Sequence, residues 1–216
     1  MTDIFREVDE ELRREQYLKL WQKYGRYLAA VAALIVLATG AIVGWRQYQD
    51  HVRTARSIDY QNAVSLAARG DDGAAAAFAK IGAGEDGYGS LARLREAALA
   101  ARQGDRQGAL AVYEKLADDA RVDPLFRQAA TILYAELALA GDRAEPDRAS
   151  LDTRLMPLMA PGNPWRLVAS ELAALNALKA GDTARARALY QAVADEASAP
   201  AGMRARAAEM LAAIGK

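Results

Sequence analysis

The sequence predicts an all-α protein in which one transmembrane helix near the N-terminus is followed by a solenoid of paired helices. Three observations in the 216-residue chain support this prediction. One long run lacks charged residues, the remainder is rich in alanine with apolar residues at helical spacing, and Gly-Asp pairs recur at nearly regular intervals.

The uncharged run covers residues 27–45, YLAAVAALIVLATGAIVGW, between Arg26 and Arg46. As a helix it would be roughly 28 Å long, close to the bilayer core of about 30 Å. Aromatic rings favour the membrane–water interface, and they are found at both ends of the run. These candidate interface residues are Trp21, Tyr24, Tyr27, Trp45 and Tyr48. The alternative is the central helix of a soluble domain.

The run divides the chain into an N-terminal helix at 1–26, a transmembrane helix at 27–45 and a helical domain at 46–216. The run is longer than the apolar core of a signal peptide, which favours a retained anchor. Five basic residues precede it and three follow at a similar distance. This bias places the N-terminus in the cytoplasm and the large domain outside, in the periplasm of a Gram-negative cell.

Within the run, Gly40 and Gly44 form a G-x-x-x-G pattern. Small residues one turn apart allow a second transmembrane helix to approach closely. The pattern predicts a helix contact in the membrane, although glycines there are also tolerated without one. Residues 1–26 are interpreted as an anchor helix near the membrane surface or as a docking helix for a cytoplasmic partner.

Gly-Asp pairs begin at Gly70, Gly104, Gly141 and Gly181, with spacings of 34, 37 and 40 residues. Each pair follows an apolar-periodic segment, where a glycine can close a helix in the left-handed conformation. Helix–turn–helix units that recur near 34 residues are typical of a tetratricopeptide array.

Two of these units align closely. Residues 102–120, RQGDRQGALAVYEKLADDA, and residues 179–197, KAGDTARARALYQAVADEA, share eight of nineteen positions. The small alanine would let paired helices pack closely, and the tyrosine one turn later would fill space towards the next unit. Chance similarity between alanine-rich helices is the alternative. The predicted repeat-packing residues are Gly104, Ala109, Tyr113, Gly181, Ala186 and Tyr190.

The remaining units are less regular. The first is expected at about 47–81 with Phe78 as its aromatic residue, and a last amphipathic helix at 200–214 would cap the array. In the third unit, prolines predict a short or displaced second helix. They are Pro146, Pro157, Pro161 and Pro164.

The composition gives no support for catalysis. The chain has 28 basic and 28 acidic residues. It therefore lacks the excess of positive charge that is typical of nucleic-acid-binding proteins. It has no cysteine and a single histidine, His51, so thiolate metal sites and histidine triads are excluded. The motif GAGEDG at 82–87 follows AAAAFAK, a helix former, where a dinucleotide site requires a strand. No enzyme activity, cofactor, metal or small-molecule substrate is expected.

Residues 43–64 carry the most specific resemblance: the anchor ends in VGWRQYQ, and RTARSIDYQNAV follows. With the N-terminal DIFREVDEELRREQ and the degenerate Gly-Asp units, the chain resembles the YfgM-like tetratricopeptide family, the ancillary subunit of the SecYEG translocon, in its alphaproteobacterial form. Several repeat positions that normally hold large residues are alanine or arginine here, such as Arg93.

The resemblance implies a single-pass inner-membrane protein with its array in the periplasm. It would act beside the SecYEG channel, binding exported polypeptides and a periplasmic chaperone or peptidyl-prolyl isomerase. The alternative is an envelope scaffold for outer-membrane assembly, cell division or a respiratory complex. The first helix of each unit is expected to line the binding groove.

Overall fold

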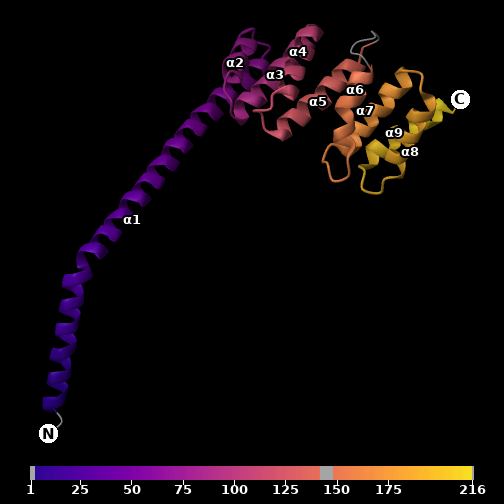
Figure 1. Cartoon of the computed structure of the whole chain (residues 1–216). Helices are drawn as coiled ribbons and strands as arrows, with labels where there is room; N and C mark the ends of the chain where they lie inside the picture. Colours follow the sequence, from indigo (N-terminus) through magenta and orange to yellow (C-terminus); the bar gives the residue numbers. More distant parts are fainter. Residues whose placement is uncertain (1–2, 142–147, 216) are drawn as a thin grey trace. The chain divides into compact units, whose positions relative to one another are not determined.

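The computed structural model describes residues 3–141 and 148–215, with side chains from residue 23 onward except at residue 32. The described residues form helices joined by short turns (Figure 1), as the fold class predicts. The helices are α1 Asp3–Ala68, α2 Gly73–Gly82, α3 Gly87–Arg102, α4 Arg106–Asp118, α5 Pro124–Leu139, α6 Arg148–Leu155, the 3-10 helix η1 Met156–Met159, α7 Arg166–Lys179, α8 Thr183–Asp195 and α9 Ala201–Ile214.

The chain divides into two compact units, residues 1–55 and 56–216. In the first unit, α1 contains a stretch long and apolar enough to cross a membrane, and none of it is buried by the rest of the protein. That exposure argues against a central helix of a soluble domain. The last turns of α1 belong to the second unit, where they form the first helix of the array.

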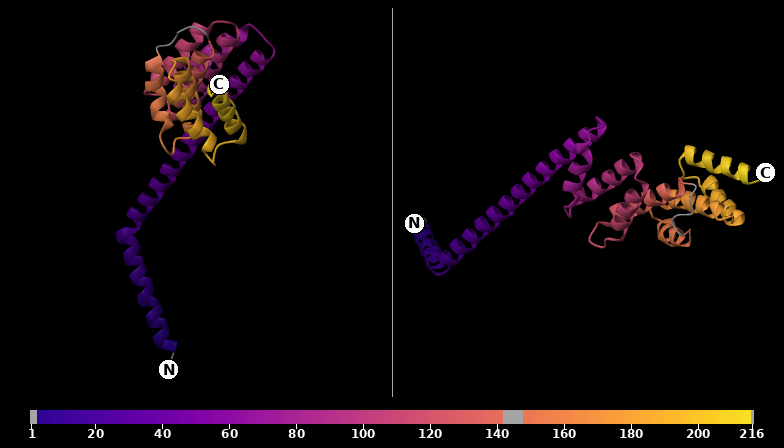
Figure 2. Two further views of the ribbon diagram at one scale, coloured as in Figure 1. Left: turned by 90° about the vertical axis from the view of Figure 1, so that its right-hand side faces the viewer. Right: turned by 90° about the horizontal axis from the view of Figure 1, so that it is seen from above.

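The array consists of neighbouring helices packed in pairs (Figure 2): α1 with α2, α3 with α4, and α7 with α8. The third pair is irregular, because only the short α6 and η1 occupy the place of its second helix. The first helices of neighbouring units are in contact, α3 with α5 and α5 with α7. The predicted shortening of the second helix in the third pair is confirmed, although Pro146 lies outside the described residues.

In the Gly-Asp turns, the glycine allows the preceding helix to close and the aspartate caps the helix that follows. Gly104 has a φ of 90°, and the Asp105 backbone N–H donates to the Ala100 carbonyl, which closes α3. The Asp105 carboxylate then accepts a hydrogen bond from the Gly108 N–H and caps α4. Gly181 and Asp182 repeat this geometry between α7 and α8.

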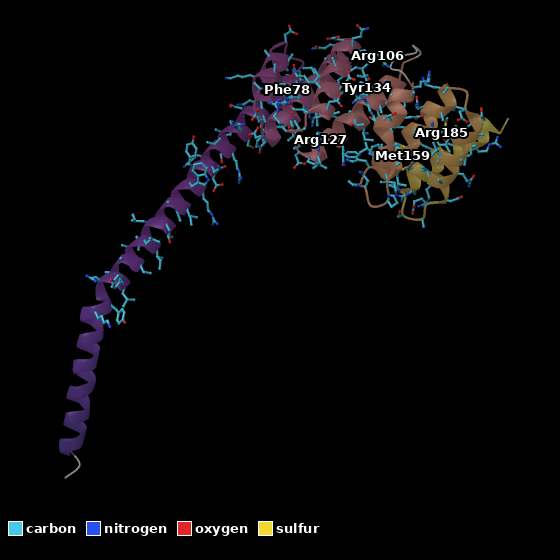
Figure 3. The ribbon with its side chains drawn as sticks, viewed as in Figure 1. Phe78, Arg106, Arg127, Tyr134, Met159 and Arg185 are labelled. Atoms are coloured by element: carbon cyan, nitrogen blue, oxygen red, sulfur yellow. The ribbon has the colours of Figure 1, made fainter. Side chains whose placement is uncertain are left out.

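The left-handed prediction is wrong at Gly141, which lacks a positive φ, and Asp142 lies outside the described residues. Here cations satisfy the carbonyls at the end of α5. Arg106 Nη2 donates to the Ala138 carbonyl at 3.0 Å, and Lys179 Nζ donates to the Gly141 carbonyl at 3.0 Å (Figure 3 labels Arg106). A glycine suits the site because a Cβ would lie 2.7 Å from Arg106 Nη2.

Because the turn requires the left-handed conformation, we expect Gly181→Ala to lower the free energy of unfolding by about 1–2 kcal/mol. Gly202 in α9 is the matched control. It has an ordinary φ and no atom near its missing Cβ, so Gly202→Ala should leave stability unchanged or raise it by up to about 1 kcal/mol. Urea unfolding of the full chain in detergent micelles, followed by circular dichroism, measures both. Equal effects of the two substitutions on the free energy of unfolding would contradict the conclusion that residue 181 must adopt the left-handed backbone conformation.

The core of the array is built largely from small residues. More than half of the buried apolar residues in the described part of the chain are alanines. Small side chains let helix axes approach closely, but each buries little apolar surface. The few large buried side chains therefore contribute disproportionately to stability. The largest fully buried ones are Phe78, Leu116, Leu151, Leu155, Val193 and Asn176.

Arginine side chains add polar links between helices of neighbouring units. Arg154 on α6 bonds to Asp118 and Glu114 on α4 at 2.7 and 2.8 Å, and it lies over the Tyr134 ring on α5. Arg93 also acts as a link: its Nε donates to the Gly82 carbonyl at 2.7 Å and closes the end of α2. The arginine at this repeat position therefore serves as a helix cap.

Candidate binding groove

A groove runs between α5, α7 and α9 at the C-terminal end of the array. Its cavity is about 450 Å³, and the Tyr190 ring on α8 lines it. The cavity is within the size range of small-ligand sites. We call this site the C-terminal groove. Its lining residues are Glu136, Val168, Glu171, Leu172, Leu175, Tyr190, Met203, Arg206, Glu209 and Met210.

Apolar side chains line most of the groove. Val168, Leu172 and Leu175 are spaced by four and three residues, so they share one face of α7. Met203 and Met210 are two turns apart on α9 and pack beside Tyr190. Methionine side chains adapt readily to different partners. The groove can therefore accept apolar groups of varied shape.

The charged residues of the groove are predominantly acidic. Arg206 donates to both carboxylate oxygens of Glu171, at 2.9 and 3.0 Å, which anchors α9 to α7. Within the described part of the chain, neither Glu136 nor Glu209 has an ion pair. Partial burial raises the pKa of the Glu136 carboxyl, and the nearby Glu171 carboxylate raises it further. The groove therefore carries uncompensated negative charge.

A second cavity, of about 490 Å³, lies between the last turns of α1 and α2. Its charged groups are mixed in sign, with Arg56, Lys80 and Asp59 on its walls. Arg56 is already paired with Asp86 at 2.5 Å. The mixed charge gives no selectivity for a charged partner, so the C-terminal groove is the stronger candidate.

The predicted interface aromatics lie on α1. Tyr24, Tyr27, Trp45 and Tyr48 are exposed, and the last two rings stack with centroids 6.3 Å apart. The side chain of Trp21 lies outside the described residues. Exposed aromatics suit a membrane interface, and this role stays a prediction.

The glycines at 40 and 44 also lie on an open surface of α1. A Cβ added to Gly40 or Gly44 would meet no atom within 4 Å. Another helix can therefore approach this side without obstruction. Their role in helix packing stays a prediction.

Four of the six predicted repeat-packing residues are buried where neighbouring helices meet, but Gly104 and Gly181 are exposed in the turns and pack against no other described helix. Ala109 and Tyr113 on α4 belong to the main core, and Tyr190 on α8 packs with Val193 against α9. Ala186 on α8 is fully buried. Tyr190 also lines the C-terminal groove, so it belongs to both the core and the candidate site.

The acidic residues of the groove were not identified from the sequence. A usable signal was present: Glu136 and Glu171 are about one repeat apart, and both lie on first helices of their units. Among the described residues, no group of three or more histidine or acidic side chains is arranged to hold a metal ion. The groove offers apolar surface and carboxylates for non-covalent binding.

The fold and the groove define a helical-repeat protein with a binding face. Residues 19–157 match the family described as "Tetratricopeptide repeat-like domain", and the chain belongs to this family. The chain is also 29% identical over 168 residues to the "Ancillary SecYEG translocon subunit" of Escherichia coli (strain K12). That alignment covers 76% of this chain and 78% of the relative, which confirms the family resemblance noted in residues 43–64. No solved structure gives a significant match.

Proposed function

We propose that this protein is an accessory of the Sec translocon that is anchored in the inner membrane and binds other proteins through its array. It links exported polypeptides to periplasmic chaperones and has no catalytic activity. The observation that carries the proposal is the similarity to the ancillary translocon subunit over three quarters of the chain. A tetratricopeptide array with an open groove supports it, because such arrays present extended binding surfaces.

In this proposal residues 27–45 span the membrane, residues 1–26 lie in the cytoplasm and residues 46–216 lie in the periplasm. The excess of basic residues before the span supports this orientation. Gly40 and Gly44 would contact a membrane helix of the channel, since their side of α1 is free of obstruction. The interface aromatics would fix the depth of the helix.

The test is purification of tagged full-length protein from its native membranes in mild detergent, with mass spectrometry of accompanying proteins. We expect channel subunits and a periplasmic chaperone. The double variant Gly40→Ile with Gly44→Ile should reduce recovery of the channel at least about tenfold, because bulky side chains block close helix packing. Ala38→Ile, roughly opposite Gly40 on the helix, is the control and should have no effect.

Recovery of a division, respiratory or outer-membrane assembly complex would instead favour the alternative function, an envelope scaffold. Recovery of the protein alone would contradict a stable association with either. If channel recovery survives the double glycine variant, the array must make the contact, and the proposed role of the two glycines is wrong.

A further inference from the structure

We infer that the C-terminal groove binds polypeptide segments in which lysine or arginine side chains are flanked by apolar ones. The inference rests on the proposed function, because it names the class of polypeptide that the array would hold. It concerns one part of the array, between α5, α7 and α9, and one kind of segment.

The apolar part of the groove selects for apolar side chains. Val168 and Leu172 line one wall, and Met203 and Met210 line the facing one, with the Tyr190 ring among them. Burying an apolar side chain here would remove surface from water on both partners. The cavity of about 450 Å³ accommodates a short stretch of chain and excludes a folded domain.

The charges select for cations. The ionisable groups that line the groove are Glu136 on α5, Glu171 on α7, Tyr190 on α8, and Arg206 and Glu209 on α9. Arg206 donates from Nε and Nη2 to the Glu171 carboxylate, which balances its charge and leaves Glu136 and Glu209 as the excess charges of the groove. Glu136 and Glu209 have no ion pair within the described residues, and each can accept a charge-assisted hydrogen bond.

A single lysine or arginine side chain can contact both the apolar surface and the carboxylates of the groove. Their aliphatic stems lie along apolar surface while the charged group reaches a carboxylate. An acidic segment would place its carboxylates against Glu136 and Glu209, and like charges repel. A neutral apolar segment would leave both carboxylates without a partner. Charge complementarity therefore points to basic, apolar segments of a partner polypeptide.

The test uses full-length protein in nanodiscs of zwitterionic phosphatidylcholine, which avoid attracting basic peptides to the lipid. The probes are fluorescent 12-residue peptides of lysine and leucine, the same peptide with glutamate for lysine, and the same peptide with serine for leucine. Anisotropy should show binding of the first peptide at least about tenfold tighter than either of the others. Empty nanodiscs provide the background.

The charge variant is Glu136→Gln with Glu209→Gln, expected to weaken binding of the lysine–leucine peptide about tenfold or more and to reduce its dependence on salt. The matched control is Asp72→Asn with Glu85→Gln, which removes the same charge from exposed positions outside the groove. It should bind as the unmodified protein does.

Equal binding by the charge variant and its control would overturn the inference, as would equal binding of the glutamate peptide. A concentration-dependent dimer that blocks peptide binding and is lost in the charge variant would also overturn it, because a second copy would then occupy the groove. These results leave the translocon association standing, since co-purification tests that association without reference to peptide binding.

Discussion

Replacing Tyr113 by alanine is expected to lower the free energy of unfolding of the array by about 3–5 kcal/mol, as for other large aromatic truncations. The Tyr113 side chain is only 3% exposed and lies in the main core with Ala97 of α3 and Ile132 of α5. The alanines of this core, such as Ala97 and Ala109, are too small to fill the space left by the ring, so a cavity would remain. Urea unfolding of the full chain in detergent, followed by circular dichroism, measures the loss.

Two further variants test whether the loss comes from the aromatic ring and whether it depends on the position in the array. Tyr113→Phe keeps the ring and should stay within about 1 kcal/mol of the unmodified protein. Tyr190→Ala removes the equivalent ring at the C-terminal end, where only α9 follows. In a repeat array each unit contacts only its neighbours, so a substitution near one end disrupts fewer helix contacts than a central one. Tyr190→Ala should therefore unfold fewer helices than Tyr113→Ala. A Tyr113→Ala loss below about 1 kcal/mol would contradict an important packing role for this ring.

The division of the chain into an anchor and helical units could be predicted from the sequence because both have strong local signals. An uncharged run of membrane length and Gly-Asp turns are each readable within a short window. The prediction was wrong at Gly141 because the determinant is distant: Arg106, on another helix, closes the end of α5. A local pattern cannot report a cap supplied by a residue elsewhere in the chain.

The C-terminal groove could be predicted only in part, since the one-repeat spacing relates Glu136 to Glu171 and does not identify Glu209. Glu136, Glu171 and Glu209 come from three helices, and each alone resembles an ordinary solvated surface charge. Only the stacking of α5, α7 and α9 brings them to one cavity. The same applies to Arg93, whose role as a helix cap depends on the position of the Gly82 carbonyl.

A buried polar network holds the irregular third unit in place. Asn176 on α7 is 1% exposed, and its Nδ2 donates to the Arg148 carbonyl and to Asp152 Oδ1, both at 3.0 Å. Arg185 on α8 is ion-paired with the other oxygen of Asp152 (Figure 3 labels Arg185). The short α6 is thus fixed to α7 and α8, which offsets the small apolar surface that eight residues can bury.

The donor role of Asn176 predicts that Asn176→Asp, which preserves size and shape, will cost about 3–5 kcal/mol at pH 8. The substitution removes both donated hydrogen bonds and places a buried carboxylate against that of Asp152. Burial and the neighbouring carboxylate should raise the pKa of the new carboxyl above its unfolded value of about 3.9. The cost is therefore present above the raised pKa and shrinks as the pH falls through it, because the protonated group can again donate.

Asn163→Asp is the matched control for this prediction. Asn163 Oδ1 accepts a hydrogen bond from the Trp165 backbone N–H at 2.8 Å, and a carboxylate can accept the same bond. The control should therefore change stability by less than about 1 kcal/mol and show little dependence on pH. Urea unfolding of the full chain at pH 8 and pH 5, followed by circular dichroism, measures both variants. If the Asn176→Asp cost is the same at the two pH values, the buried negative charge is not its cause, and the loss of the two donated hydrogen bonds would account for it.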